Sequence, residues 1–388
     1  MSIASIHGMM FASRAGHVEV SGIRKMFESA PPGAINLGLG EPDLQPPPKI
    51  IEALKKAIDS GMNKYGPTGG IPELRQAVAE RLAKFADVKP DAVLITAGAT
   101  EALCVTMQTL IDNGDEVLIP DPGFVLFGPH VRLAGGIPVT YSLSKDSGFV
   151  PGIDELRALV THRTKAIIVN SPANPTGAVF DKKTVQAIAD FAKEEGLIVI
   201  SDEVYDAIIY EGAHESFLGR YENTVYVNSF SKVFAMTGWR LGYLTAPPEM
   251  IKQMAKIHYY MVACPPTPTQ YAVLAGLREP EDYVSKMVKE FGIRREIMVK
   301  ELGKMPGFHC LKPKGAFYAF PTYDYDMASE EMAMSLLNGG VICTPGRAFG
   351  EQGERHIRFS YANSQDNIKK AMERIRLHLE TALKGKIK

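Results

Sequence analysis

The chain has 388 residues, of which 45% are hydrophobic and 22% are charged. This length and composition are those of a folded protein with two or three domains, and they exclude a largely disordered or fibrous chain. Because the chain has 43 basic and 44 acidic residues, its net charge is -1. No overall field therefore attracts nucleic acid or an anionic membrane. Any anion must be bound by a local site.

The cysteines are too widely spaced for a zinc site or a disulfide scaffold, since no CxxC occurs among Cys104, Cys264, Cys310 and Cys343. The first 20 residues contain no basic segment followed by a long apolar core. No later stretch has the roughly 18 apolar residues that a membrane span requires. We therefore expect a cytoplasmic protein with reduced thiols, without a metal and without nucleic-acid or membrane partners.

From about residue 48 onward, helix-period segments alternate with short apolar runs, a pattern typical of an α/β sheet built from crossover units. In chain order, the pattern predicts helices over 50–57 and 74–85, a strand over 92–95, a helix from about 101, and strands over 116–119, 165–169, 197–200 and 224–227. These runs are apolar on both faces, which predicts a mostly parallel sheet covered by helices.

The composition changes in the far part of the chain. A long charged amphipathic helix is predicted over 281–302, the run Gly-Ala-Phe-Tyr-Ala-Phe follows at 315–320, and a last helix is predicted over 365–383. This order predicts a second, smaller α+β domain.

The most informative stretch is residues 229–242, which follow directly on the last predicted strand of the sheet. A lysine at this place, Lys232, points into the crevice where open α/β sheets bind ligands. The hydroxyls of Ser229 and Ser231 and the guanidinium of Arg240 can together bind a phosphate. Considered alone, Lys232 would be interpreted as an ordinary surface lysine in a loop.

Three polar residues follow two earlier strands of the same sheet. Asp202 and Tyr205 come after one predicted strand, 30 residues before Lys232. Asn174 lies in a turn after another strand, where an X-Pro bond can be cis. Without further context, Asp202 is a helix cap or turn residue and Asn174 a purely structural asparagine.

Small residues join the strand over 92–95 to the helix that follows it. Ala99 and Thr100 lie in this loop, where the backbone can approach an anion and the N–H groups of the helix start can hold it. Phe124, in Asp-Pro-Gly-Phe, is a core residue if considered by itself.

Near the C-terminus, Arg358 alternates with the apolar residues Ile357 and Phe359, as in a strand. Its guanidinium therefore faces the side opposite to them. A buried arginine needs an anion, which is either a carboxylate of a ligand or an internal salt bridge.

Together these motifs resemble the class I/II, fold type I, pyridoxal-5'-phosphate (PLP)-dependent aminotransferases, in particular the aspartate-aminotransferase-like subgroup. The resemblance extends from about residue 20 to 375, and the stretch 229–242 resembles the family's lysine attachment signature. It implies an α/β fold with a mostly parallel, seven-stranded sheet in a large PLP-binding domain, residues 48–280. It also implies a small C-terminal α+β domain, residues 281–388, and an N-terminal segment, residues 1–47, that packs on the small domain and over the active site.

The resemblance also assigns roles to the residues. Lys232 holds the cofactor as a Schiff base and then serves as general base, Asp202 keeps the pyridine nitrogen protonated, and Tyr205 and Asn174 bind the 3'-oxygen. The remaining cofactor contacts fall to Ala99, Thr100, Ser229, Ser231 and Arg240 at the phosphate and to Phe124 on the ring. Gly40, Asn174 and Arg358 contact the substrate carboxylate.

Tyr65 lies too early in the chain to belong to the sheet. In the family, the matching tyrosine reaches the phosphate of the neighbouring subunit, so the resemblance implies a homodimer with shared active sites.

The implied activity is transfer of an amino group between an L-amino acid, aspartate or a broader set that includes aromatic ones, and a 2-oxo acid such as 2-oxoglutarate, with ping-pong kinetics. Some aspartate enzymes of the subgroup carry lysine where Thr100 stands here. Side-chain pocket candidates are Phe349 and the stretches 17–20 and 258–260. The alternatives are a C–S β-lyase with nearly the same residues and a non-catalytic, effector-sensing module. A dehydrogenase is disfavoured because no GxGxxG follows the first strand.

Overall fold

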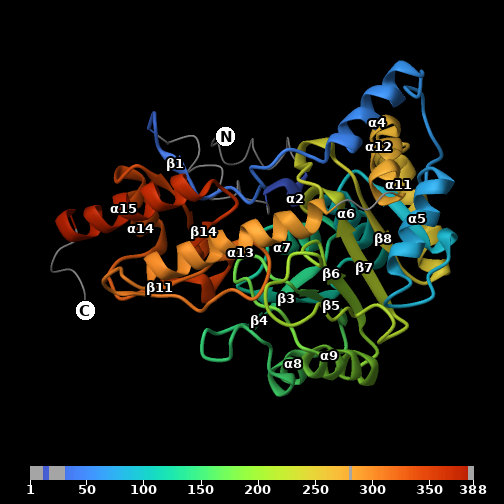
Figure 1. Cartoon of the computed structure of the whole chain (residues 1–388). Coiled ribbons are helices and arrows are strands. Elements are labelled where there is room, and N and C mark those ends of the chain that lie inside the picture. The colour runs from blue at the N-terminus through green and yellow to red at the C-terminus, as the bar shows by residue number, and fades with distance from the viewer. Residues whose placement is uncertain (1–11, 17–30, 279–281, 383–388) are drawn as a thin grey trace, which may run out of the picture.

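The computed structural model describes residues 12–16, 31–278 and 282–382. Its centre is a seven-stranded sheet whose order across the sheet is β2-β8-β7-β6-β5-β3-β4 (Figure 1). Only β8 runs antiparallel to its two neighbours, and the other adjacent pairs are parallel. In that order the strands are β2 (Val93–Thr96), β8 (Gly242–Thr245), β7 (Thr224–Ser229), β6 (Ile198–Asp202), β5 (Thr164–Asn170), β3 (Glu116–Asp121) and β4 (Ile137–Ser142).

Helices cover both faces of this sheet because its central strands are apolar on both sides. In β5, Ile168 packs with α6, α7 and α11, whereas its neighbour Ile167 packs with α8 and α9, as the two-residue period of a strand requires. A further group, α4, α5, α10 and α12, packs around β2 and β8. The helices are α4 (Pro48–Asp59), α5 (Pro72–Leu82), α6 (Ala99–Leu110), α7 (Phe127–Leu133), α8 (Ile153–Leu159), α9 (Lys182–Glu194), α10 (Phe230–Val233), α11 (Pro248–Val262) and α12 (Thr267–Arg278).

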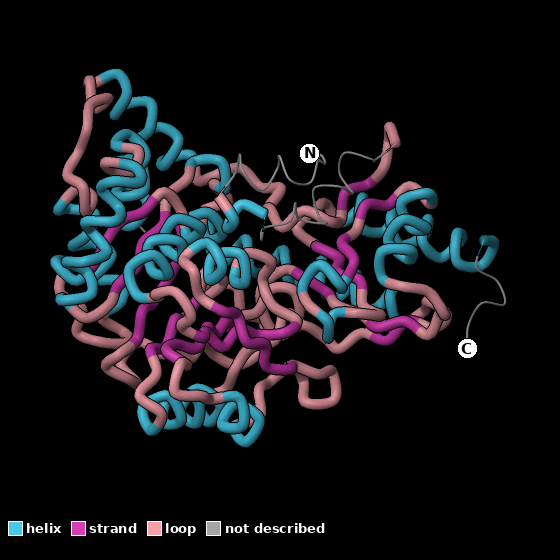
Figure 2. The backbone as a smooth tube through the Cα atoms, turned by 180° about the vertical axis from the view of Figure 1, so that it is seen from behind, coloured by secondary structure: helices cyan, strands magenta, loops and turns pink. Residues whose placement is uncertain are grey.

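The C-terminal elements form a second group with its own core, drawn in orange and red in Figure 1 and seen from behind in Figure 2. Its helices are α13 (Tyr283–Leu302), α14 (Ser329–Asn338) and α15 (Gln365–Ala382). Its short strands form the sheets β10-β14-β13 and β11-β9, with bounds β9 (Phe308–His309), β10 (Tyr318–Ala319), β11 (Thr322–Tyr323), β13 (Thr344–Pro345) and β14 (Ile357–Ser360).

The described part of the N-terminal segment joins this second group. The strand β1 (Ile35–Asn36) pairs in parallel with β12 (Val341–Ile342), and Leu37 belongs to the same core as α13 to α15. The chain therefore enters beside the C-terminal elements before it builds the large sheet. Single turns complete the fold: α2 (Ser13–Gly16), η1 (Pro90–Ala92), η2 (Thr237–Trp239), η3 (Gly346–Phe349) and η4 (Glu351–Gly353).

All five strands predicted from apolar runs are present, within one or two residues of their expected bounds. The five helices that the sequence predicts are also present, as α4, α5, α6, α13 and α15. The seven-stranded, mostly parallel sheet is confirmed. The strands β4 and β8 were not predicted. Among the described residues, no helix is both long enough and apolar enough to span a bilayer.

Candidate active site

The carboxyl ends of the parallel strands meet the second group of elements at one place, and most of the predicted site residues lie there. Strand β6 ends at Asp202, and β7 runs directly into α10, which carries Lys232. The Nζ atom of Lys232 donates to the carbonyl oxygen of Gly40, 2.7 Å away, in the N-terminal segment. Strand β14 brings Arg358 from the far end of the chain. Open α/β sheets bind ligands at this edge.

Lys232 is not an ordinary surface lysine. The pKa of its ammonium group is lowered to about 8, chiefly by burial and also by the nearby cations Arg358 and Arg240, against the opposite effect of Glu41 and Asp202. An amine with this pKa is partly unprotonated at neutral pH, as a nucleophile or general base must be.

Asp202 is a buried carboxylate, only 3% exposed. Its pKa is raised to about 7, chiefly by burial and also by the adjacent Glu203, whereas the N–H of Val204, 3.3 Å from Oδ1, and Lys232 act to lower it. A carboxylate that is this costly to ionise has a strong tendency to hold a proton or to bind a cation. A protonated pyridine nitrogen is such a cation, so the residue fits the role expected for it.

The raised pKa of Asp202 makes a prediction for stability. Its value of about 7, above the ordinary 3.8, means that the cofactor-free folded protein binds this proton more tightly than the unfolded chain does. The favourable contribution is complete below about pH 4 and is lost as the pH rises through 7. Relative to the wild type, cofactor-free Asp202→Asn should gain up to about 4 kcal/mol in unfolding free energy between pH 4 and pH 8. Urea denaturation at several pH values measures this, and a difference that does not change with pH would contradict it.

Tyr205 lies in the same place, but its closest polar partner was not predicted. Its hydroxyl is 2.7 Å from the hydroxyl of Tyr318, which lies on β10. Tyr318 also explains the glycine at position 40, because a Cβ atom there would lie 2.2 Å from the Tyr318 hydroxyl oxygen. The sequence offered only the aromatic run 315–320, with no signal that one of its members enters the site.

Arg358 is a buried cation, 2% exposed. Its Nη1 donates to Oδ1 of Asn174 at 2.9 Å, and Nη2 donates to the carbonyl of Gly38 and to Thr344 Oγ1. The guanidinium also faces the ring of Phe349, 4.8 Å from its centroid. These partners are all neutral.

Among the described residues no carboxylate pairs with Arg358, so the internal salt bridge considered from sequence is not observed. Within the same part of the chain, the buried Nε atom has no hydrogen-bond partner either. An uncompensated buried guanidinium is costly, and a ligand carboxylate bound by two parallel hydrogen bonds would compensate it.

Asn174 holds its place through its backbone. Its N–H donates to Oδ1 of Asn170 at 2.9 Å, and Asn170 in turn donates to the carbonyl of Asp202. The peptide bonds before Pro172 and Pro175 are cis. Asn174 and Arg358 are therefore brought together, as expected for residues that share one substrate group.

The predicted phosphate-binding residues surround the start of α6. Gly98, with φ of +85°, precedes the helix, and a Cβ atom on it would lie 2.6 Å from Nη2 of Arg240. Arg240 also donates to the carbonyl of Ala97 at 3.3 Å, so its guanidinium lies beside the N–H groups of Ala99 and Thr100 that a helix leaves without partners.

The two serines lie where β7 passes into α10, Ser229 at the end of the strand and Ser231 in the helix. Ser229 pairs in register with Gly242, and a Cβ atom on Gly242 would lie 2.8 Å from the nitrogen of Ala99. Ser231 donates its N–H to Ser229 Oγ at 3.1 Å. Helix N–H groups, hydroxyls and a guanidinium are the donors that a phosphate dianion needs, so the residues present fit PLP.

Two predicted residues have no hydrogen bond or ring contact with the other site residues described here. Tyr65 is 88% exposed in the single chain. Phe124 is half-buried after β3, with its ring edge-on to that of Phe127 and 5.7 Å between the ring centroids.

The side-chain pocket candidates lie in different places. Phe349 lies against Arg358, and its role in side-chain recognition stays a prediction. In the stretch 258–260, His258 is fully buried in contact with Glu101 and Tyr260 is 86% exposed on α11, so its role in side-chain recognition stays a prediction. Residues 17–20 lie outside the described part of the chain.

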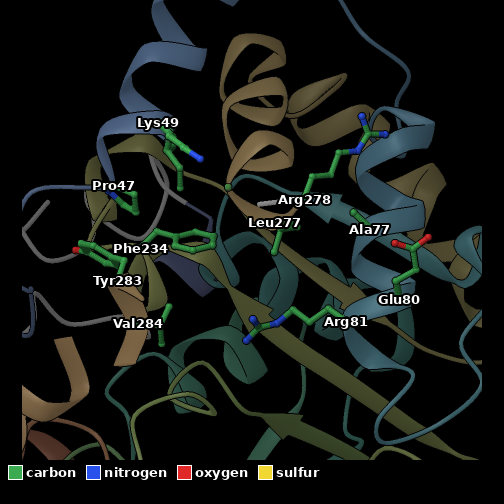
Figure 3. A pocket seen from close by; sticks show the side chains of 12 residues that line it. Pro47, Lys49, Ala77, Glu80, Arg81, Phe234, Leu277, Arg278, Tyr283 and Val284 are labelled. Atoms are coloured by element: carbon green, nitrogen blue, oxygen red, sulfur yellow. The ribbon is translucent and has the colours of Figure 1, made fainter. Parts of the chain in front are cut away.

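A pocket of about 470 Å³ lies elsewhere, between α4, α5, α12 and the start of α13 (Figure 3). Its Arg81 is already paired with buried Asp206 at 3.0 Å. Phe234, two residues after Lys232, lines it, but Lys232, Asp202 and Arg358 do not. The pocket is therefore separate from the candidate active site.

Comparison with known proteins agrees with this geometry. The family model described as aminotransferase class I and II matches residues 32–375. A probable aspartate aminotransferase of Methanocaldococcus jannaschii is 43% identical over 94% of this chain and 98% of that protein. The aromatic-amino-acid aminotransferase 2 of Thermococcus litoralis is 41% identical over 97% and 99%. The solved structure of Thermus thermophilus aspartate aminotransferase with maleate has a TM-score of 0.90 and 35% identity, covering 95% of this chain and 99% of that one.

Similarity of this extent covers both groups of elements and not only the lysine motif. It agrees with a site that combines a lysine of lowered pKa, a buried aspartate and an uncompensated arginine. The chain belongs to the class I and II aminotransferase family and is a PLP-dependent transaminase.

Proposed function

We propose that this transaminase exchanges the amino group between an L-amino acid, aspartate or a broader set including aromatic ones, and a 2-oxo acid such as 2-oxoglutarate, with ping-pong kinetics. The observation that carries the proposal is the uncompensated guanidinium of Arg358, which Asn174 orients through its side-chain oxygen at 2.9 Å. A carboxylate common to every amino acid and 2-oxo acid supplies its missing anion. Relatives named for aspartate and for aromatic amino acids support this substrate range.

When bound, PLP supplies an electron sink that acidifies the Cα–H bond of an attached amino acid. Arg358 fixes the α-carboxylate with its planar fork, which orients that bond. The Nζ atom of Lys232, with its pKa of about 8, would accept the Cα proton and return it to C4' of the cofactor. Asp202 would hold the proton on the pyridine nitrogen, and the Tyr205 hydroxyl, which is hydrogen-bonded to that of Tyr318, would donate to the 3'-oxygen.

The side-chain specificity of the site has an aromatic component. Phe349 lies beside Arg358. The ring of Phe320 is edge-on to the ring of Phe349, with 6.0 Å between the two ring centroids. Thr100 stands where some aspartate enzymes of the subgroup have a lysine. This position therefore supplies no positive charge for an acidic substrate side chain. Both features favour a range wider than aspartate alone.

The test is spectroscopic. Purified protein reconstituted with PLP should show the visible absorption band of a lysine-bound cofactor, and glutamate should shift it toward that of pyridoxamine phosphate. A panel of 2-oxo acids, including 2-oxoglutarate, oxaloacetate and aromatic ones, should then restore the first band and identify the second substrate. Release of pyruvate and ammonia from cystathionine without any such half-reaction would instead support a C–S β-lyase.

We also propose that the active sites are shared between two subunits, in a cytoplasmic homodimer. Tyr65 is 88% exposed, and the carbonyl of Lys64 beside it is held by Thr267 Oγ1 at 2.9 Å, so the loop presents the tyrosine outward from an anchored backbone. Tyr260 is exposed to a similar extent on α11. The proposed organisation of each subunit is an N-terminal segment, 1–47, a large domain, 48–280, and a small domain, 281–388.

Complementation tests the shared site. Lys232→Ala and Tyr65→Ala homodimers should each have low activity, but co-expressed subunits should recover activity. In the mixed dimer, one site has both an intact Lys232 and an intact Tyr65 from the other subunit. Light scattering gives the mass of each preparation. A monomeric mass, or no recovery in purified mixed dimers, would refute the shared site.

A further inference from the structure

A buried carboxylate lies in the first turn of the helix that is expected to bind the phosphate. Glu101 is the third residue of α6, follows Thr100 and is 7% exposed. Its Oε2 accepts the N–H of Ala97, and its Oε1 lies 2.6 Å from Nδ1 of His258. The positive end of a helix stabilises either anion, so an unpaired carboxylate here would oppose a bound phosphate.

His258 is fully buried on α11 and uses both ring nitrogens. Its Nε2 lies 2.8 Å from the carbonyl oxygen of Thr68. Because a carbonyl can only accept, Nε2 carries a hydrogen and donates it. The contact between Nδ1 and Glu101 then contains one proton, located either on the ring or on the carboxyl group.

In both arrangements the Glu101–His258 pair has a net charge of zero. If the proton is on Nδ1, an imidazolium faces a carboxylate, and if it is on Glu101, both groups are neutral. Either way, the charge of Glu101 is compensated from the side of α11. The positive end of α6 then remains available for another anion.

We infer that His258 is a positioning residue that neutralises Glu101 and so reserves the start of α6 for the phosphate of PLP. This inference rests on the proposed phosphate-binding role of Ala99 and Thr100. The histidine also ties α6 to the loop that carries Tyr65, since Thr68 lies three residues after that tyrosine. One buried pair thus holds two segments that are both expected to contact phosphate, one in each subunit.

The experiment compares three variants of the full-length protein: His258→Gln, Glu101→Gln and the double variant. His258→Gln leaves Glu101 charged and unneutralised, so its dissociation constant for PLP should rise by at least about tenfold. Glu101→Gln keeps an acceptor for the Ala97 N–H and removes the charge, so it should bind PLP at least as tightly as the wild type. The double variant should bind within about threefold of Glu101→Gln, because no charge remains there.

The readout is binding and not turnover. The single tryptophan of the chain, Trp239, precedes Arg240, so its fluorescence can follow PLP titration at the phosphate-binding residues. Pyridoxal, which lacks the phosphate, is the matched ligand, and its affinity should be nearly the same in all three variants and the wild type. Urea denaturation without cofactor shows whether each variant is folded.

Three results would overturn the inference. One is a His258→Gln protein that loses affinity for PLP and for pyridoxal equally. Another is a double variant that binds PLP no better than His258→Gln. Either result would indicate that His258 contributes only to packing. The third, weaker PLP binding by Glu101→Gln, is decisive even if His258→Gln does not fold. Wild-type protein that binds no PLP would instead refute the proposed function, and the inference would fall with it.

Discussion

Replacing Lys232 with alanine should lower kcat for transamination by at least about 10⁴-fold and abolish the visible band of the lysine-bound cofactor. The amine is expected to serve twice, as the covalent anchor of PLP and as the base that moves the Cα proton, and a positioned base alone contributes up to about 10⁴-fold. Its pKa of about 8 and its place beyond β7 suit both roles. Stopped-flow spectra of the half-reaction with glutamate measure the effect on proton transfer directly.

The matched control is Lys56→Ala, which removes an exposed lysine from α4. It should leave the band and the rate unchanged. PLP should still bind to Lys232→Ala, because the predicted phosphate contacts of Ser229, Ser231 and Arg240 are intact. A Lys232→Ala protein that keeps a substantial part of the wild-type rate would show that another group transfers the proton.

The elements that could be predicted from sequence are those whose residues carry the whole signal. The central strands β5, β6 and β7 are buried along most of their length, so a short apolar run was enough to locate them. Strand β4 lies at the edge of the sheet, begins with the exposed Ile137 and contains Pro138, and its pattern is therefore not that of a buried strand. Strand β8 has four residues, begins with a glycine and breaks the parallel order, which an alternation of helices and strands does not predict.

The site follows the same division. Lys232, Asp202 and Asn174 each lie at or just beyond the end of a strand, so local sequence was sufficient to select them, and their spacing carried the family resemblance. Tyr318 and the Glu101–His258 pair were missed because their partners lie 113 and 157 residues away. Only the fold gives a reason to connect an aromatic residue on β10 with one after β6. A buried histidine on α11 gave no sign of its acidic partner.

Replacing Arg358 should have opposite effects on function and on stability. Arg358→Met removes the fork for the α-carboxylate, and losing one partner of a buried charge pair costs 2–5 kcal/mol, so kcat/KM for amino acids should fall by roughly 30-fold to several thousand-fold. Burial already lowers the pKa of this guanidinium, and its partners are neutral in the absence of a ligand. Cofactor-free Arg358→Met should therefore be at least as stable as the wild type, because it no longer buries an uncompensated charge.

Arg358→Lys separates charge from geometry. A lysine keeps the positive charge but not the planar pair of donors, so KM should rise and kcat/KM should remain well below that of the wild type. Steady-state kinetics and urea denaturation on the same preparations measure both properties. If Arg358→Met lost stability along with activity, the arginine would be a structural element of the core, and the anion that it needs would have to come from the protein. If stability is kept while kcat/KM falls, the substrate carboxylate is the anion that pairs with Arg358, and its binding offsets the cost of burying the guanidinium.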